Sequence, residues 1–222
     1  VQALARLEKL FAGHDYVVAV GGAGLYVRAL CEGMDDLPQA DESLREEMDR
    51  WLAEEGLGAL AEKLRELDPE YYRIVDLNNP ARVVRALEVC LQTGMPYSRQ
   101  RTGIRRARPF EIVKIGVDLP REELYDRINR RVDRMLADGL EAEARALYPY
   151  RELNALQTVG YREFFDYFDG RIGYDEAVEL IKRNSRRYAK RQLTWFRRDP
   201  EIRWFRPDDD AAMINYIDFG KS

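Results

Sequence analysis

The 222-residue sequence has little histidine and little cysteine, with one His and two Cys. A single His argues against a catalytic triad with a histidine base. Together with Cys31 and Cys90 it also offers too few ligands for a structural zinc site. Two Cys are too few for a disulfide framework, which favours a reducing compartment. We therefore expect a cytoplasmic protein whose chain supplies no metal centre.

Long apolar runs are missing as well. No stretch of about 18 apolar residues occurs, so the sequence predicts no transmembrane helix and no membrane partner. Glu8, His14 and Asp15 interrupt the apolar residues near the start, which is unlike a signal peptide. With 45% hydrophobic and 34% charged residues, the composition is that of a globular protein with a highly charged surface.

The charges are nearly balanced in total but separated along the chain. There are 36 basic and 40 acidic residues, for a net charge of −4. Basic residues without any acid occupy 99–108 and 182–198, and the second segment also contains Tyr188, Trp195 and Phe196. Such a run is either a solvated helix face or a surface for phosphate oxygens and bases. Charges of one sign with interleaved aromatic residues favour the second interpretation.

The hydrophobic pattern predicts a mixed α/β protein. Residues 16–20 read as a strand buried on both faces of a parallel sheet, and 112–117 and 202–205 are the other strand candidates. Three strands are few for a doubly wound sheet, so we expect further strands upstream of Val1. Helices are expected at 41–67, broken by Gly56 and Gly58, and at 80–93 and 120–136.

Four segments have the residue types of a binding site. The Gly21–Tyr26 turn can hold an anion or a flat ring, or is a strand-to-helix turn without a ligand; no Gly-Lys-Ser/Thr follows it, as a Walker loop requires. Arg82 and Arg85 share a helix face, unless Arg85 pairs with Glu88 on the surface. The other two segments are a loop at 157–162 and the string 190–197.

Arg187 and Arg191 are one helical turn apart in the same acid-free region. Two guanidinium groups at this spacing can hold one phosphate group from one helix face. Two such cations can also neutralise a phosphate or diphosphate leaving group as its bond breaks, which makes Arg187 and Arg191 candidate catalytic residues.

Together these segments resemble one family, the tRNA dimethylallyltransferases, also called tRNA isopentenyltransferases. The resemblance runs from about residue 16 to 205, in family order and spacing. The matching residues are Gly21–Tyr26, Glu32-Gly33, Leu37-Pro38, Asp41, Arg82–Glu88, Thr93-Gly94, Pro120–Glu122, Leu124-Tyr125, Arg127-Ile128, Met135-Leu136, Gly139-Leu140, Glu143, Gly160-Tyr161, Ala189–Gln192 and Thr194-Trp195.

The resemblance implies a P-loop NTPase-like core, similar to nucleoside-phosphate kinases, with a mainly α-helical insertion. The core would comprise 1–38 and 109–222, and the insertion 39–108. The implied reaction moves a dimethylallyl group from dimethylallyl diphosphate to N6 of adenosine 37, next to the anticodon of tRNA. The implied cofactor is Mg²⁺, and the partners are the anticodon stem-loop and dimethylallyl diphosphate. We expect a monomer.

The resemblance also implies which residues contact tRNA. At position 23 the family usually has Thr, and Ala23 keeps only a backbone contact because it has no hydroxyl. The implied tRNA-binding residues are Ala23, Arg45, Ala81, Arg82, Val83, Val84, Arg85, Gln157, Thr158, Val159, Gly160, Tyr161, Arg162, Lys190, Arg191, Gln192, Leu193, Thr194, Trp195, Phe196 and Arg197.

The sequence departs from the family at its beginning. The family's Gly-rich phosphate loop and the Asp that would act as general base are not among these residues. We therefore expect the 222 residues alone to be inactive and to belong to a longer enzyme. Two alternatives are a relative that prenylates free adenine nucleotides and a non-catalytic RNA-binding module. The first needs neither the helical lobe nor the 190–197 string, and the second is favoured by the missing loop.

Overall fold

The computed structural model describes residues 2–219 and divides into two compact units. One unit comprises the residues up to 17 together with 28–109, and the other comprises 18–27 and the residues from 110 onward. The division into a core at 1–38 and 109–222 and an insertion at 39–108 stays a prediction.

The first unit is helical. Its helices are α1 (Gln2–Phe11), the later part of α2 (Gly24–Glu32), α3 (Glu42–Leu67), α4 (Pro69–Tyr72), α5 (Pro80–Thr93) and α6 (Tyr97–Gln100). The expected break in the long helix is confirmed at Gly56, whose φ is 80°. Gly94 ends α5 in the left-handed conformation, with φ of 69°, because a glycine tolerates positive φ.

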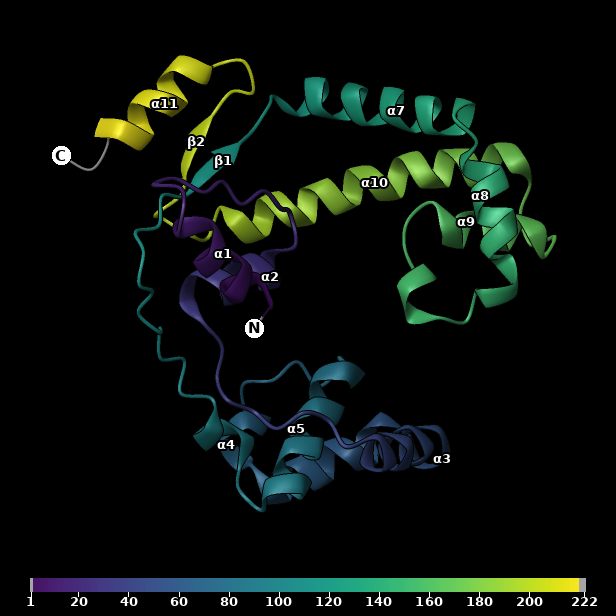
Figure 1. Cartoon of the computed structure of the whole chain (residues 1–222). Coiled ribbons are helices and arrows are strands. Elements are labelled where there is room, and N and C mark those ends of the chain that lie inside the picture. The colour runs from purple at the N-terminus through teal and green to yellow at the C-terminus, as the bar shows by residue number, and fades with distance from the viewer. Residues whose placement is uncertain (1, 220–222) are drawn as a thin grey trace. The chain divides into compact units, whose positions relative to one another are not determined.

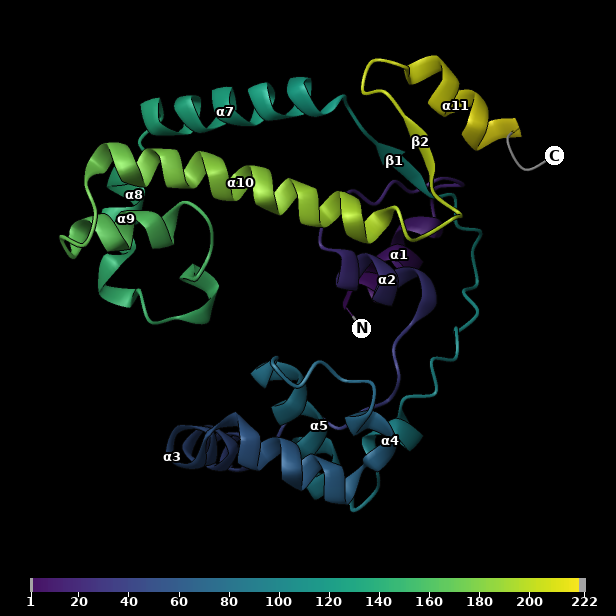
Figure 2. The same ribbon diagram turned by 180° about the vertical axis from the view of Figure 1, so that it is seen from behind.

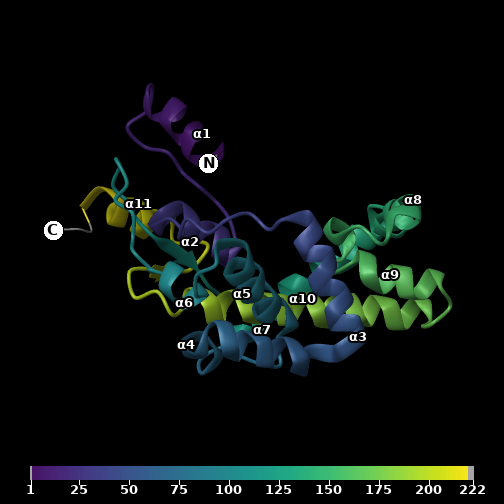
Figure 3. The ribbon, with the colours of Figure 1, turned by 90° about the horizontal axis from the view of Figure 1, so that it is seen from below.

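The core of this unit lies between α3 and α5, which pack side by side (Figures 1 and 3). Leu60 and Leu64 of α3 and Val83 and Leu87 of α5 are fully buried. Apolar residues three and four positions apart form one face of a helix, and here each helix buries that face on the other.

The second unit is built on one long helix. Its elements are β1 (Ile115–Val117), α7 (Arg121–Ala137), α8 (Leu140–Leu147), 3₁₀ turns at Tyr148–Tyr150 and Asn154–Leu156, α9 (Tyr161–Phe168), α10 (Tyr174–Phe196), β2 (Arg203–Phe205) and α11 (Asp210–Phe219). Helix α7 runs beside α10, and α8 and α9 lie near the beginning of α10 (Figures 1 and 2). Phe164, Phe165, Ala177 and Ile181 are buried in this corner.

The strand predictions are partly right. β1 and β2 pair in parallel, with Ile115 opposite Arg203, within the predicted ranges. The strand expected at 16–20 is wrong, since this segment has no strand conformation and Val18 and Val20 are 82% and 95% exposed. An isolated apolar segment cannot form a strand without a hydrogen-bonded neighbour, and none of the described residues pairs with it.

Candidate nucleic-acid interface

Four cations form a stripe along the second half of α10. Arg183, Arg187, Lys190 and Arg191 are all exposed, and at 100° per residue they fall within an arc of roughly 100° of the helix. Within residues 2–219 none of the four forms an ion pair. We call these four residues the α10 cation stripe. Unpaired cations on one face present positive charge that a polyanion can neutralise.

The other cations of this helix already have partners. Lys182 Nζ lies 2.6 Å from an Asp133 carboxylate oxygen, and Arg186 donates to Asn129 Oδ1 at 2.6 Å. Arg197, which directly follows the helix, places its Nη2 2.5 Å from Asp118 Oδ2. In the basic segment 182–198, some cations thus hold α10 in place, and the α10 cation stripe remains available to a partner.

Aromatic side chains lie beside the stripe. The Arg191 guanidinium is 5.6 Å from the centre of the Tyr188 ring, and Tyr188 is 47% exposed. Trp195, one turn further along, is 39% exposed. Exposed rings next to cations are the arrangement on which nucleic-acid bases stack.

The glycine turn before α2 contacts α10 directly. Gln192 Nε2 donates to the Gly22 carbonyl oxygen at 2.9 Å. A Cβ atom at Gly22 would lie 2.1 Å from Gln192 Nε2, and one at Gly24 would lie 2.3 Å from the Trp195 indole. Because Gly22 and Gly24 have no Cβ atoms, α10 can approach this turn closely. The structure thereby brings Ala23 close to the 190–197 string.

Gly24→Ala should displace the Trp195 ring, because the added methyl group has no space. We expect the affinity for the anticodon stem-loop predicted above as the partner to fall about ten-fold, because a base stacked on an aromatic ring contributes about 1–3 kcal/mol, and the Trp195 fluorescence to change. Gly58→Ala is the matched control, since a Cβ atom added there would have no neighbour within 4 Å. A stem-loop affinity equal to that of the control would contradict the prediction.

A surface cavity of about 250 Å³ separates the beginning of α7 from the end of α10. Its lining combines leucine side chains with cationic ones. It is lined by Leu119, Arg121, Leu124, Tyr125, Lys190, Leu193, Thr194 and Arg197. Four of these residues belong to the predicted 190–197 string.

The loop at 157–162 leads into α9, which lies near the beginning of α10 (Figure 3). Gln157 and Thr158 are exposed, whereas Gly160 is buried with φ of 103°. The Tyr161 hydroxyl donates to Glu143, and this hydrogen bond raises the pKa of Tyr161. The exposed loop residues remain open to a partner, as the prediction for this segment requires.

Arg45 and Arg85 meet at a buried carboxylate in the first unit. Arg45 Nη2 lies 3.1 Å and Arg85 Nη1 lies 3.3 Å from Oε2 of Glu88, which is 0% exposed. Arg85 also donates to the Pro38 carbonyl oxygen at 2.6 Å. The hydrogen bond to Glu88 raises the pKa of Arg45. Arg85 does pair with Glu88, but inside the unit rather than on its surface.

The remaining predicted residues of α5 divide by burial. Ala81 and Arg82 are exposed, while Val83 is 0% and Val84 6% exposed within the α3–α5 core. Their side chains are therefore not accessible to a partner in this structure, and tRNA contacts at Val83 and Val84 stay a prediction. Their β-branched side chains support the helix that presents Arg82.

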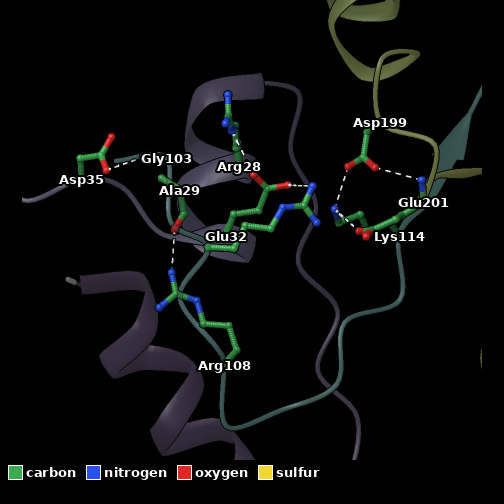
Figure 4. Close-up of polar contacts among 10 residues, drawn as sticks. Arg28, Ala29, Glu32, Asp35, Gly103, Arg108, Lys114, Asp199 and Glu201 are labelled. Atoms are coloured by element: carbon green, nitrogen blue, oxygen red, sulfur yellow. Dashed lines mark hydrogen bonds and ion pairs between the residues drawn. The ribbon is translucent and has the colours of Figure 1, made fainter. Parts of the chain in front are cut away.

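The basic segment 99–108 is largely paired within its own unit (Figure 4). Arg108 donates to the carbonyl oxygens of Leu30 and Ala29, both at 2.8 Å. Asp35 accepts from the Thr102 hydroxyl at 2.7 Å and the Gly103 N–H at 3.0 Å. These hydrogen bonds, that of the Thr102 side chain above all, lower the pKa of Asp35. This segment is held by α2 and the chain after it.

Lys114 forms two ion pairs in the second unit (Figure 4). Its ammonium group lies 2.7 Å from Asp199 and 2.8 Å from Glu201. Burial alone lowers the pKa of Lys114, but the hydrogen bonds to the two carboxylates outweigh it and raise the pKa. These ion pairs connect the residue directly before β1 to the segment between α10 and β2.

Two findings bear on metals and membranes. No group of three or more His, Cys, Asp or Glu in residues 2–219 is placed to hold a metal ion. The described residues therefore supply no cluster of ligands for Mg²⁺ by themselves. No helix in the same range combines the length and apolarity needed to cross a bilayer.

Comparison with known proteins identifies the family. The model of the family described as IPP transferase matches residues 1–199. The chain belongs to this family. A tRNA dimethylallyltransferase of Cytophaga hutchinsonii is 52% identical over 217 residues, covering 98% of this chain and 71% of that protein. A tRNA dimethylallyltransferase 1 of Phocaeicola vulgatus is 52% identical, covering 96% and 71%.

Two solved structures are similar to this chain in fold. The full-length tRNA isopentenylpyrophosphate transferase of Bacillus halodurans is 40% identical, with a TM-score of 0.54 over 89% of this chain and 63% of that chain. A eukaryotic dimethylallyltransferase acting on tRNA has a TM-score of 0.68 at 23% identity, over 91% and 53%. The predicted family and its P-loop NTPase-like fold class are confirmed.

Two structurally important residues were missed by the sequence interpretation. Glu163 is 5% exposed and accepts a hydrogen bond from Asn184 of α10, and neither residue stood out as a candidate. A Glu at the third position of a helix is a recognisable capping signal, but its reach to a residue 21 positions away is not.

Proposed function

We propose that this chain acts in tRNA modification, as part of an enzyme that transfers a dimethylallyl group from dimethylallyl diphosphate to N6 of the adenosine next to the anticodon. The α10 cation stripe is the observation that carries the tRNA-binding part of the proposal. Unpaired cations with neighbouring aromatic rings bind phosphates without regard to sequence and stack bases.

The transfer forms a bond between adenine N6 and the allylic carbon as the carbon–oxygen bond to diphosphate breaks. N6 loses a proton and the diphosphate leaves with the bonding electrons. Positive charge near the leaving group stabilises that step the most. Arg187 and Arg191 are exposed and lack an acidic partner in the described part of the chain, which supports their role in neutralising the diphosphate.

The remaining contacts would position the anticodon loop. The target base must leave the stack to be reached, so the protein has to hold the neighbouring nucleotides firmly. The exposed residues of 157–162, Arg82 of α5 and the Trp195 ring are available for this. Mg²⁺, a monomeric state and a cytoplasmic location stay predictions.

The experiment is transfer of a labelled dimethylallyl group by the protein as its gene encodes it. We expect an anticodon stem-loop with adenosine 3′ of the anticodon to be modified, and free adenine nucleotides to be left unmodified. Modification of the free nucleotide alone would favour the nucleotide-prenylating alternative. Stem-loop binding without any transfer would favour an RNA-binding module.

A further inference from the structure

Glu163 of α9 is a buried carboxylate that joins two elements. Its Oε2 accepts from the backbone N–H of Gly160 at 2.8 Å, and its Oε1 accepts from Nδ2 of Asn184 at 2.7 Å. Each oxygen thus receives one donor, one from the loop before α9 and one from α10. A buried carboxylate with a donor on each oxygen is costly to disturb, because any lost partner leaves polar atoms unsatisfied.

The loop end of this arrangement is a constrained backbone. Gly160 has φ of 103°, a conformation that residues with a Cβ rarely adopt. Its N–H points to Glu163, so the carboxylate holds the turn that carries Gln157 and Thr158 on its exposed side. One of the groups that hold this loop is therefore a side chain that is itself buried.

The helix end of the arrangement lies beside the α10 cation stripe. Asn184 immediately follows Arg183 and precedes Arg187 by three residues, which is less than one helical turn. Glu163 consequently links the loop at 157–162 to the stripe through two hydrogen bonds.

We propose that Glu163 and Asn184 are positioning residues that fix the loop at 157–162 relative to the α10 cation stripe, so that both contact one tRNA anticodon stem-loop. This inference rests on the proposed function and extends it to two residues that do not contact the substrate themselves. The link works only while one partner accepts and the other donates.

Exchanging the donor and the acceptor between positions 163 and 184 tests this link. Glu163→Ala removes both acceptor oxygens, so the Gly160 N–H and the Asn184 amide each lose their partner. Asn184→Asp places a second carboxylate against Glu163. In the double variant Glu163→Gln/Asn184→Asp, the new amide donates to the new carboxylate and still accepts from Gly160, so both hydrogen bonds are present and only the one to position 184 is reversed.

The experiment measures transfer and binding with the protein as its gene encodes it. Each single variant should raise the KM for the stem-loop about ten-fold, the usual effect of an unsatisfied buried polar group, with the KM for dimethylallyl diphosphate unchanged. The double variant should return the stem-loop KM to near the wild-type value. Hydrogen exchange at the Gly160 amide should rise in both single variants and fall again in the double variant.

Other outcomes would overturn the inference. Unchanged stem-loop KM in both single variants would do so, as would a double variant as impaired as the worse single one. A parallel rise in both KM values would indicate general loss of structure instead of positioning. Failure of the wild-type protein to bind the stem-loop would refute the proposed function itself, which is a different result from wild-type binding with unaffected single variants.

Discussion

Replacing the four residues of the α10 cation stripe by Gln should weaken stem-loop binding steeply and change its salt dependence. Each phosphate contact contributes roughly 0.7 to 0.9 to the slope of log affinity against log salt, so the slope should decrease in magnitude by about 3. The affinity at low salt should fall at least a hundred-fold, because about four charge contacts are lost. Fluorescence titration at several salt concentrations measures both quantities.

A matched control variant removes four positive charges elsewhere in the second unit. Each of the four control cations is in an ion pair with a neighbouring carboxylate and is exposed. They are Arg130, Arg145, Arg171 and Arg206. Replacing them by Gln should leave the salt slope near the wild-type value. Equal slopes in the stripe variant and the control variant would show that net charge alone, and not this face of α10, governs binding.

The catalytic part of the stripe is tested separately. Arg187→Ala/Arg191→Ala should lower kcat at saturating stem-loop, because a diphosphate leaves more slowly without neighbouring positive charge. Arg183→Ala/Lys190→Ala is the comparison, with the same loss of charge on the same face. If kcat is unchanged in the first variant, the diphosphate role of Arg187 and Arg191 is wrong while their role in tRNA binding can still hold.

Arg45→Ala/Arg85→Ala should destabilise the first unit strongly. Glu88 is fully buried and both of its guanidinium partners would be removed. Leaving a buried charge without a partner costs about 3–5 kcal/mol. Hydrogen exchange of the α5 amides reports the free energy of opening this helix, without requiring the two units to unfold together.

Two further variants show whether the buried charge of Glu88 causes the loss of stability. Adding Glu88→Met to the double variant should restore most of the lost stability, because the uncompensated charge is then gone. Arg82→Ala removes an exposed cation of α5 and should leave its hydrogen exchange unchanged. A double variant as stable as Arg82→Ala would mean that Glu88 does not depend on its partners.

Local signals account for the parts of the fold that the sequence predicted well. Asp41 caps α3 by accepting from the Leu44 N–H at 3.1 Å, and Pro80 and Gly94 delimit α5 as expected. These signals act over three or four residues, so they can be recognised without the fold. The segment 16–20 shows the opposite case, because its apolar residues indicate a strand only if a neighbouring strand exists.

The sequence by itself determined the family, the acid-free basic segment and the limits of most helices. Only the tertiary structure decided which cations are available, since the partners of Arg197 and Arg45 lie 79 and 43 residues away. It also decided that Gly22 and Gly24 admit α10 and that Glu163 reaches Asn184. The physical reason is that ion pairs, close approaches and buried hydrogen bonds join residues distant in the chain, whereas caps, helical spacing and charge runs are properties of neighbours.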